Sequence, residues 1–179
     1  SSPPGAPLPV PPSPLEAGYA EALNGRIAYY ETSRGCPFRC SFCLSGGEDP
    51  VRFFPEERAV GDLIRLANAG CRTVKLVDRT FNADRARARR IFERLIDDCG
   101  VLFPRGVTFH FELEGRLLDE ETLALLERAP AGLFQFELGL QSTNAETLAA
   151  IGRATDTASI LSATRRLVAS GRCHVHLDL

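Results

Sequence analysis

The sequence RIAYYETSRGCPFRCSFCLS, residues 26–45, joins a predicted β-strand to a loop that contains three cysteines. Its first part, residues 26–33, is rich in aromatic and β-branched side chains, which favour strands. Cys36, Cys40 and Cys43 follow directly. In α/β folds, ligands bind at the carboxyl ends of the strands. The segment therefore predicts a ligand-binding loop at the end of the first strand.

Outward from this segment, strand-like and helix-like patterns alternate to the end of the chain. Four further strands are predicted, at residues 73–78, 107–113, 133–140 and 173–179. Helical patterns lie between them: from Pro55 to a Gly70 cap, along a stripe of Ile91, Phe92, Leu95 and Ile96, after an Asp119 N-cap, at 145–151 and at 157–169. This alternation implies parallel strands with right-handed crossovers, hence α/β. The periodicity alone leaves a barrel and a doubly wound sheet open.

The composition fits one globular unit that is not confined to a membrane. The chain has 179 residues and a net charge of −2, which gives no overall attraction to nucleic acid. No apolar run approaches the ~18 residues of a membrane span, and no signal peptide is recognisable. A cytoplasmic location is therefore expected, where six cysteines favour metal binding or packing over disulfides.

The amino-terminal segment SSPPGAPLPVPPSP is predicted to be extended, because proline disrupts helices and sheets. We assign residues 1–25 to a proline-rich linker and residues 26–179 to the core domain, with a turn at 46–48. The chain lacks methionine and finishes on a strand-like pattern, so we expect a piece of a longer protein.

Three interpretations of the cysteine cluster remain open at this point. A four-iron cluster held by three cysteines would leave one iron free to bind a substrate or cofactor, whereas an electron-transfer cluster uses four. A structural zinc site also needs four ligands, and a distant group such as His110 could complete it. The third interpretation is a chance clustering of thiols.

The motif Cys36-x3-Cys40-x2-Cys43, with Phe42 before the last cysteine, resembles the signature of radical S-adenosylmethionine (radical SAM) enzymes. The longer stretch ETSRGCPFRCSFCLS is especially similar to their cobalamin-binding branch. The resemblance implies a partial (β/α)6 barrel, truncated after about five strands. It also implies a 4Fe-4S cluster on the three cysteines, whose open iron chelates the amino and carboxylate groups of S-adenosylmethionine.

The order of HFELEGRLLDEE, LGLQS, IGRAT and HLDL resembles the coproporphyrinogen-oxidase-like branch of the superfamily. The resemblance implies that Glu112, Gln141, Arg153 and Asp178 contact S-adenosylmethionine. Structural roles are the alternatives: loop bracing for Gln141, a helix-terminal charge for Arg153, and an internal cation partner for each carboxylate. Asp78 stands near the position where relatives hold the methionine amino group, and a loop-bracing role is its alternative.

The predicted function is reductive cleavage of S-adenosylmethionine to a 5′-deoxyadenosyl radical, in a full-length protein with an upstream cobalamin domain and methyltransferase chemistry. Expected partners are a small-molecule substrate and a reducing electron donor such as flavodoxin or ferredoxin, without membrane or nucleic acid. The alternatives are a methylthiotransferase that modifies RNA and a non-catalytic zinc module.

Residues outside the motifs receive structural predictions. The arginines of DRARARRIFER are assigned to the solvated face of a helix, and Cys71, Cys99 and Cys173 to packing. His174 and His176 alternate with apolar residues and share one side of the last strand, so either a substrate cavity or a packed pair remains open.

Overall fold

The computed structural model describes residues 11–45, 51–153 and 156–179, and within them five parallel strands form one sheet. The strands are β1 (Ile27–Tyr30), β4 (Thr73–Leu76), β5 (Thr108–Leu113), β6 (Phe134–Gly139) and β7 (His174–Asp178). All five predicted strands are confirmed, with ends shifted by at most three residues. Their order, β1-β4-β5-β6-β7, never reverses. A doubly wound sheet reverses at a switch point, so the sheet is an open, partial barrel.

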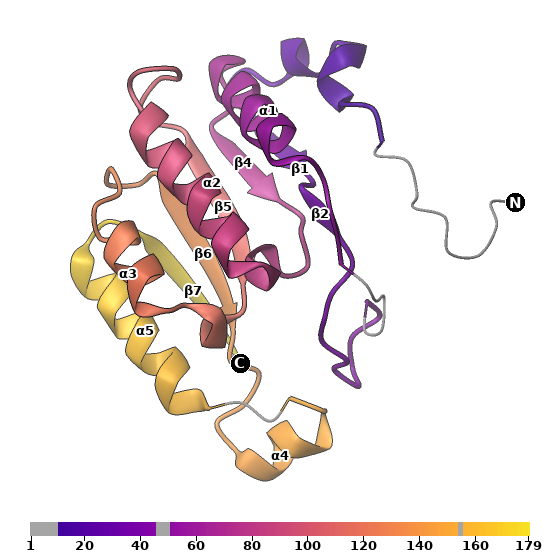
Figure 1. Cartoon of the computed structure of the whole chain (residues 1–179), viewed down its shortest axis with the longest axis vertical. Coiled ribbons are helices and arrows are strands. Elements are labelled where there is room, and N and C mark those ends of the chain that lie inside the picture. The colour runs from indigo at the N-terminus through magenta and orange to yellow at the C-terminus, as the bar shows by residue number, and fades with distance from the viewer. Residues whose placement is uncertain (1–10, 46–50, 154–155) are drawn as a thin grey trace, which may run out of the picture.

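The helices follow the strands in the predicted order. They are α1 (Glu56–Asn68), α2 (Arg85–Asp98), α3 (Glu120–Leu126), α4 (Ala145–Ala150) and α5 (Thr157–Ser170). Four begin at Asp or Asn caps whose side chains accept backbone N–H bonds: Asp84, Asp119, Asn144 and Asp156. Figure 1 shows α1, α2, α3 and α5 over one face of the sheet, whereas α4 lies beyond the carboxyl ends of the strands.

The face of the sheet that the helices cover is a buried aromatic core. Phe109, Phe111, Phe134 and Phe136 alternate along β5 and β6 and are fully buried. The ring of Phe92 from α2 lies 5.1 Å from that of Phe111 and 5.3 Å from that of Phe134, edge to face. The predicted stripe of α2 is confirmed: Ile91, Phe92 and Leu95 are fully buried and Ile96 packs against them partly exposed.

The other face of the sheet, here called the open face, carries polar side chains. Successive strand residues point to opposite sides, so Lys75, His110, Glu112, Glu137 and His176 alternate with the core residues. One set of strands thus supplies an apolar core on one side and a charged surface on the other.

A second, two-stranded antiparallel sheet pairs β2 (Ser33–Arg34) with β3 (Arg52–Phe53), which the sequence analysis did not predict. The first strand also ends three residues earlier than expected. Beyond Tyr30 the backbone N–H of Thr32 donates to the carboxylate of Asp78 at 3.0 Å instead of continuing the ladder. The chain therefore leaves the main sheet just before the cysteine loop.

Part of the predicted linker packs onto the domain. Two 3₁₀ turns, η1 (Pro14–Ala17) and η2 (Tyr19–Ala22), lie in the assigned linker, mostly beyond the segment expected to be extended, and the Ser13 side chain caps the first. Leu15 and Leu23 are 5% and 4% exposed and belong to the core cluster. Their apolar surface outweighs the preference of the prolines for extended chain, since proline is compatible with the start of a helix. Linker residues 1–10 and the predicted turn at 46–48 lie outside the described residues.

The three cysteines outside the motif lie in or against the core, as expected. Cys71 and Cys99 are buried and Cys173 is partly buried. Burial raises the pKa of each thiol, that of Cys173 to about 12. Among the described residues, no helix is long and apolar enough to cross a bilayer.

Candidate functional site

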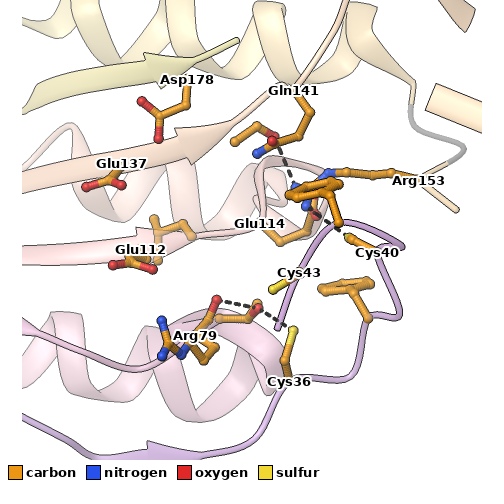
Figure 2. A pocket seen from close by; sticks show the side chains of 15 residues that line it. Cys36, Cys40, Cys43, Arg79, Glu112, Glu114, Glu137, Gln141, Arg153 and Asp178 are labelled. Atoms are coloured by element: carbon orange, nitrogen blue, oxygen red, sulfur yellow. Dashed lines mark hydrogen bonds and ion pairs between the residues drawn. The ribbon is translucent and has the colours of Figure 1, made fainter. Parts of the chain in front are cut away.

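A cavity of about 220 Å³ opens at the carboxyl ends of the strands, beside the cysteine loop (Figure 2). It is lined by Cys36, Phe38, Cys40, Phe42, Cys43, Arg79, Thr80, Glu112, Leu113, Glu114, Glu137, Gly139, Gln141, Arg153 and Asp178. Eight of the nine predicted site residues are in this set. The topology thus gathers segments far apart in the sequence into one pocket.

The three motif cysteines are free thiols, and all of them line this pocket. The Sγ atom of Cys36 lies 3.5 Å from the hydroxyl oxygen of Thr80. The Sγ atom of Cys40 accepts a long contact of 3.7 Å from Nη1 of Arg153, and Cys43 is exposed. One short loop therefore presents three sulfurs to one space.

The cysteine loop is docked on the turn that follows α4. The backbone N–H of Ser41 donates to the carbonyl of Ile151 at 3.0 Å. Gly152 is left-handed, with φ of 71°, and a Cβ there would come within 3.1 Å of the Arg39 carbonyl. Glycine at position 152 therefore permits this close approach.

The donor set of three thiols from one loop fits an iron-sulfur cluster. Across the described ranges, no three Cys, His, Asp or Glu side chains lie close enough together to hold a metal ion. Free thiols are nevertheless the ligands that such clusters require. His110, the distant group proposed to complete a zinc site, does not line the pocket that holds the cysteines. Its Nε2 lies 3.2 Å from Oε2 of Glu137 instead. The geometry does not support that zinc site.

Arg153 ties three segments of the pocket together. Its Nη2 donates to Oε2 of Glu114 at 2.8 Å and to the carbonyl of Gly139 at 3.0 Å. Glu114 is 2% exposed, and its other oxygen lies 3.3 Å from Nε of Arg116. Sequence reasoning missed Glu114, although its spacing of two from Glu112 could have placed both on one side. Arg153 is thus a pocket residue rather than an exposed helix-terminal charge.

Glu112, Glu137 and Asp178 form a row of carboxylates on neighbouring strands (Figure 2). Glu112 and Glu137 are direct cross-strand partners. Burial, and then the charge of Glu137, raises the pKa of Glu112 and that of Asp178. Sequence reasoning missed Glu137, which strand alternation would have placed on the side of Gln135 and Gly139.

Gln141 has a left-handed backbone, with φ of 69°, the only such non-glycine residue in the described ranges. Its backbone N–H donates to the carbonyl of Asp178 at 2.9 Å, so it joins the ends of β6 and β7. A Cβ on Gly139 would overlap the side-chain amide of Gln141. Gly139 therefore leaves the space that this amide occupies.

Asp78 is the one predicted site residue that does not reach the pocket. Its carboxylate is fully buried and accepts bonds from the hydroxyls of Thr32 at 2.7 Å and Ser33 at 2.5 Å. The structure thus places it in the loop-bracing position that was the alternative. Its neighbours Arg79 and Thr80 line the pocket instead, as does the half-exposed ring of Phe42.

Comparison with known proteins identifies the family. The model of the Radical SAM superfamily matches residues 30–177. The radical methyltransferase TsrM from Kitasatospora setae superposes with a TM-score of 0.70 at 18% identity, covering 89% of this chain and 31% of that one. The cobalamin-dependent radical enzyme OxsB gives 0.65 at 19% identity, covering 83% and 23%. These likenesses support the partial barrel.

A curated relative is the tRNA-2-methylthio-N(6)-dimethylallyladenosine synthase of Sorangium cellulosum, 34% identical over 76 residues. The match covers 42% of this chain and 15% of that protein. This chain thus spans less than a third of the length of each relative described here. Because the family model covers most of the chain, including the cysteine loop and all later strands, the chain belongs to the radical SAM superfamily.

Proposed function

We propose that this chain is the core of an enzyme that binds a 4Fe-4S cluster on Cys36, Cys40 and Cys43 and cleaves S-adenosylmethionine reductively. The observation that carries the proposal is the presence of three free thiols and a row of carboxylates in the lining of one pocket. When bound and reduced by the electron donor, the cluster would supply the one electron that breaks a carbon–sulfur bond of the sulfonium, giving methionine and a 5′-deoxyadenosyl radical. The protein binds, orients and shields the reactants.

The pocket residues have distinct proposed roles in holding S-adenosylmethionine. Glu112 and Asp178 accept hydrogen bonds from ribose hydroxyls, and Gln141 supplies an amide beside them. Arg153 offers a guanidinium fork to the methionine carboxylate, in exchange for part of its bond to Glu114. The ring of Phe42 adds apolar surface to the pocket beside the cysteine loop. Arg79 adds a cation from the end of β4.

Asp78 has a supporting role in this proposal. It holds Thr32 and Ser33 at the start of the loop that carries the cysteines, and Nη2 of Arg87 from α2 donates to the Thr32 carbonyl at 3.2 Å. Removal of these bonds would free the loop from the sheet. Asp78 thus positions the cluster ligands without contacting S-adenosylmethionine.

For the full-length protein we propose a cobalamin-dependent radical methyltransferase with a small-molecule substrate and a cytoplasmic flavodoxin or ferredoxin as electron donor. The similarity of the fold to TsrM and OxsB supports this choice, and an upstream domain would supply the cobalamin. In such a protein the cobalamin would supply a carrier for the methyl group that is transferred to the substrate.

A second candidate is methylthiolation of RNA, which the similarity to the Sorangium cellulosum synthase favours. The arginines of α2 give it little support. Arg85 and Arg89 pair with Asp119, Arg90 with Glu56, and Arg94 with Asp98. Paired guanidinium groups are less available to RNA phosphates.

Iron loading tests the metal proposal. The chain, reconstituted anaerobically with iron and sulfide, is expected to bind about four of each. Cys36→Ala, Cys40→Ala and Cys43→Ala should each lose most of this iron, whereas Cys173→Ala should retain it. Production of 5′-deoxyadenosine after reduction tests the reaction. Full iron in all variants, or zinc in place of iron, would contradict the proposal.

A further inference from the structure

Glu114, which follows the last residue of β5, is the most enclosed carboxylate in the lining of the pocket. It is 2% exposed, as is Asn82, whose side chain holds its backbone on both sides. The N–H of Glu114 donates to Oδ1 of Asn82 at 2.9 Å, and Nδ2 of Asn82 donates to the Glu114 carbonyl at 3.0 Å. The position of the carboxylate is therefore fixed by the fold before any ligand binds.

Both oxygens of this carboxylate accept hydrogen bonds from arginines that reach the cysteine loop (Figure 2). Oε2 accepts from Nη2 of Arg153 at 2.8 Å, and Oε1 accepts from Nε of Arg116 at 3.3 Å. The Arg116 guanidinium lies 5.1 Å from the centroid of the Phe38 ring. Nη1 of Arg153 donates to Sγ of Cys40 at 3.7 Å. One buried carboxylate thus acts on two points of the loop through two cations.

The Arg153 guanidinium has little freedom to move away from Cys40. Its side chain is 13% exposed, and Nη2 also donates to the carbonyl of Gly139 at 3.0 Å. Separation of a buried ion pair is costly, because it leaves a buried charge without a partner. Cys40 is 8% exposed, so little water competes with the guanidinium for its sulfur. The N–H therefore stays directed at this one thiol.

A donor in this position affects the redox chemistry of an iron-sulfur cluster. Hydrogen bonds to the ligand sulfurs and nearby positive charge both tune the reduction potential. They raise it because the reduced cluster carries one more negative charge than the oxidised cluster. A guanidinium supplies the hydrogen bond and the charge together, and burial strengthens both.

We propose that Glu114 is a positioning residue that holds Arg153 against Cys40 and thereby raises the reduction potential of the cluster. The inference deepens the proposed function, on which it rests for the presence of the cluster. It gives Arg153 a task in the pocket before S-adenosylmethionine arrives. The carboxylate of Glu114 acts only through the arginine and contacts no iron ligand itself.

The test is the reduction potential of the reconstituted chain, from a redox titration followed by electron paramagnetic resonance without S-adenosylmethionine. The role of Arg153 in binding S-adenosylmethionine then does not enter. Arg153→Gln should reduce the equilibrium constant for reduction by about tenfold, which corresponds to about 59 mV for one electron. Arg153→Lys retains the charge but loses the planar fork, so a smaller fall is expected.

Arg166→Gln is the matched control. It removes a guanidinium that pairs with Glu120 and Glu127 and that does not line the pocket. The reduction potential of this variant should equal that of the parent. A fall as large as that of Arg153→Gln would show that loss of any arginine lowers the potential, and would overturn the inference.

The role of Glu114 is measured by coupling two substitutions. Glu114→Gln changes the local charge, so the informative quantity is the shift that Arg153→Gln causes in the Glu114→Gln background. Positioning predicts a smaller shift there than in the parent, whereas independent charge effects would add. Glu114→Asp keeps the charge but shortens the side chain, and it gives the same test if Glu114→Gln does not fold. Equal shifts in both backgrounds would overturn the inference.

Failure of the inference and failure of the proposed function have different signatures. A parent chain that binds four irons, with a potential that Arg153→Gln leaves unchanged, would overturn the inference alone. A parent chain that binds no iron would contradict the cluster and, with it, the inference.

Discussion

The two faces of the sheet use the same strands for opposite purposes. Phe111 and Glu112 are consecutive residues of β5: the first is fully buried under α2, and the second lines the pocket. Phe136 and Glu137 repeat the arrangement on β6. Burial of the aromatic face stabilises the fold, whereas the charged face brings carboxyl groups together and raises the pKa values of Glu112 and Asp178. Substitutions on the two faces should therefore differ in which property they change.

The largest effect is expected on the core face. Phe111→Ala should lower the free energy of unfolding by about 3–5 kcal/mol, because it leaves a cavity among the rings of Phe81, Phe92 and Phe136. Phe42→Ala, at a ring that is 55% exposed, should lower it by less than about 1 kcal/mol. Urea denaturation of both variants measures the difference. Equal losses of unfolding free energy would contradict the assignment of Phe111 to the core and of Phe42 to the exposed pocket.

The next effect concerns the buried carboxylate of Asp78. Asp78→Asn should cost about 1–3 kcal/mol of stability, because an amide cannot accept all the bonds that Thr32 and Ser33 donate. Asp97→Asn, at an exposed position of α2, is the matched control and should be neutral. Denaturation compares them. If Asp78→Asn were as stable as the parent, the bracing role would be wrong.

A smaller effect is expected where the pocket needs space. Gly139→Ala should displace the Gln141 amide and weaken S-adenosylmethionine binding by about tenfold, while stability changes by less than about 1 kcal/mol. Gly61→Ala, in α1 with nothing near its Cβ, should raise stability slightly and leave binding intact. Isothermal titration of the cluster-loaded chain measures affinity. Unchanged binding by Gly139→Ala would show that the amide is not used.

The smallest effect depends on pH. The pKa of Glu112 is raised by burial and by Glu137, so the folded state takes up its proton before the unfolded state does. The charged form is the unfavourable one, and its penalty is present above the folded pKa. Glu112→Gln should therefore be more stable than the parent at about pH 8, and this advantage should shrink as the pH falls to about 5. Denaturation at both pH values measures it, and a growing advantage in acid would contradict this sign.

The strands and helices were predictable because each carries a local signal. Runs of aromatic and aliphatic residues interrupted by single polar residues identified β5 and β6, and side-chain caps such as Asp119 and Asp156 mark helix starts. The cysteine loop was predictable because its ligands are close in sequence. The packing of Leu15 and Leu23 was not, since it depends on contacts with distant core residues.

The site was only partly predictable for the same reason. From the sequence, Asp78 was predicted to bind S-adenosylmethionine. Its partners are known only from the structure, where Thr32 and Ser33, more than 40 residues earlier, donate hydrogen bonds to its carboxylate. Glu114 and Arg153 are 39 residues apart, and the ion pair between them follows from the fold. Glu137 contacts Lys75 and His110, which lie on two other strands. These contacts could not be predicted because they depend on how the strands pair.

The central claim is that the three cysteines leave one iron open for S-adenosylmethionine. Electron paramagnetic resonance of the reconstituted, reduced chain tests it most directly, recorded with and without S-adenosylmethionine. The account predicts a four-iron signal that changes when S-adenosylmethionine is added, and that is absent from Cys40→Ala. A four-iron signal that S-adenosylmethionine leaves unchanged, or no cluster at all, would contradict it.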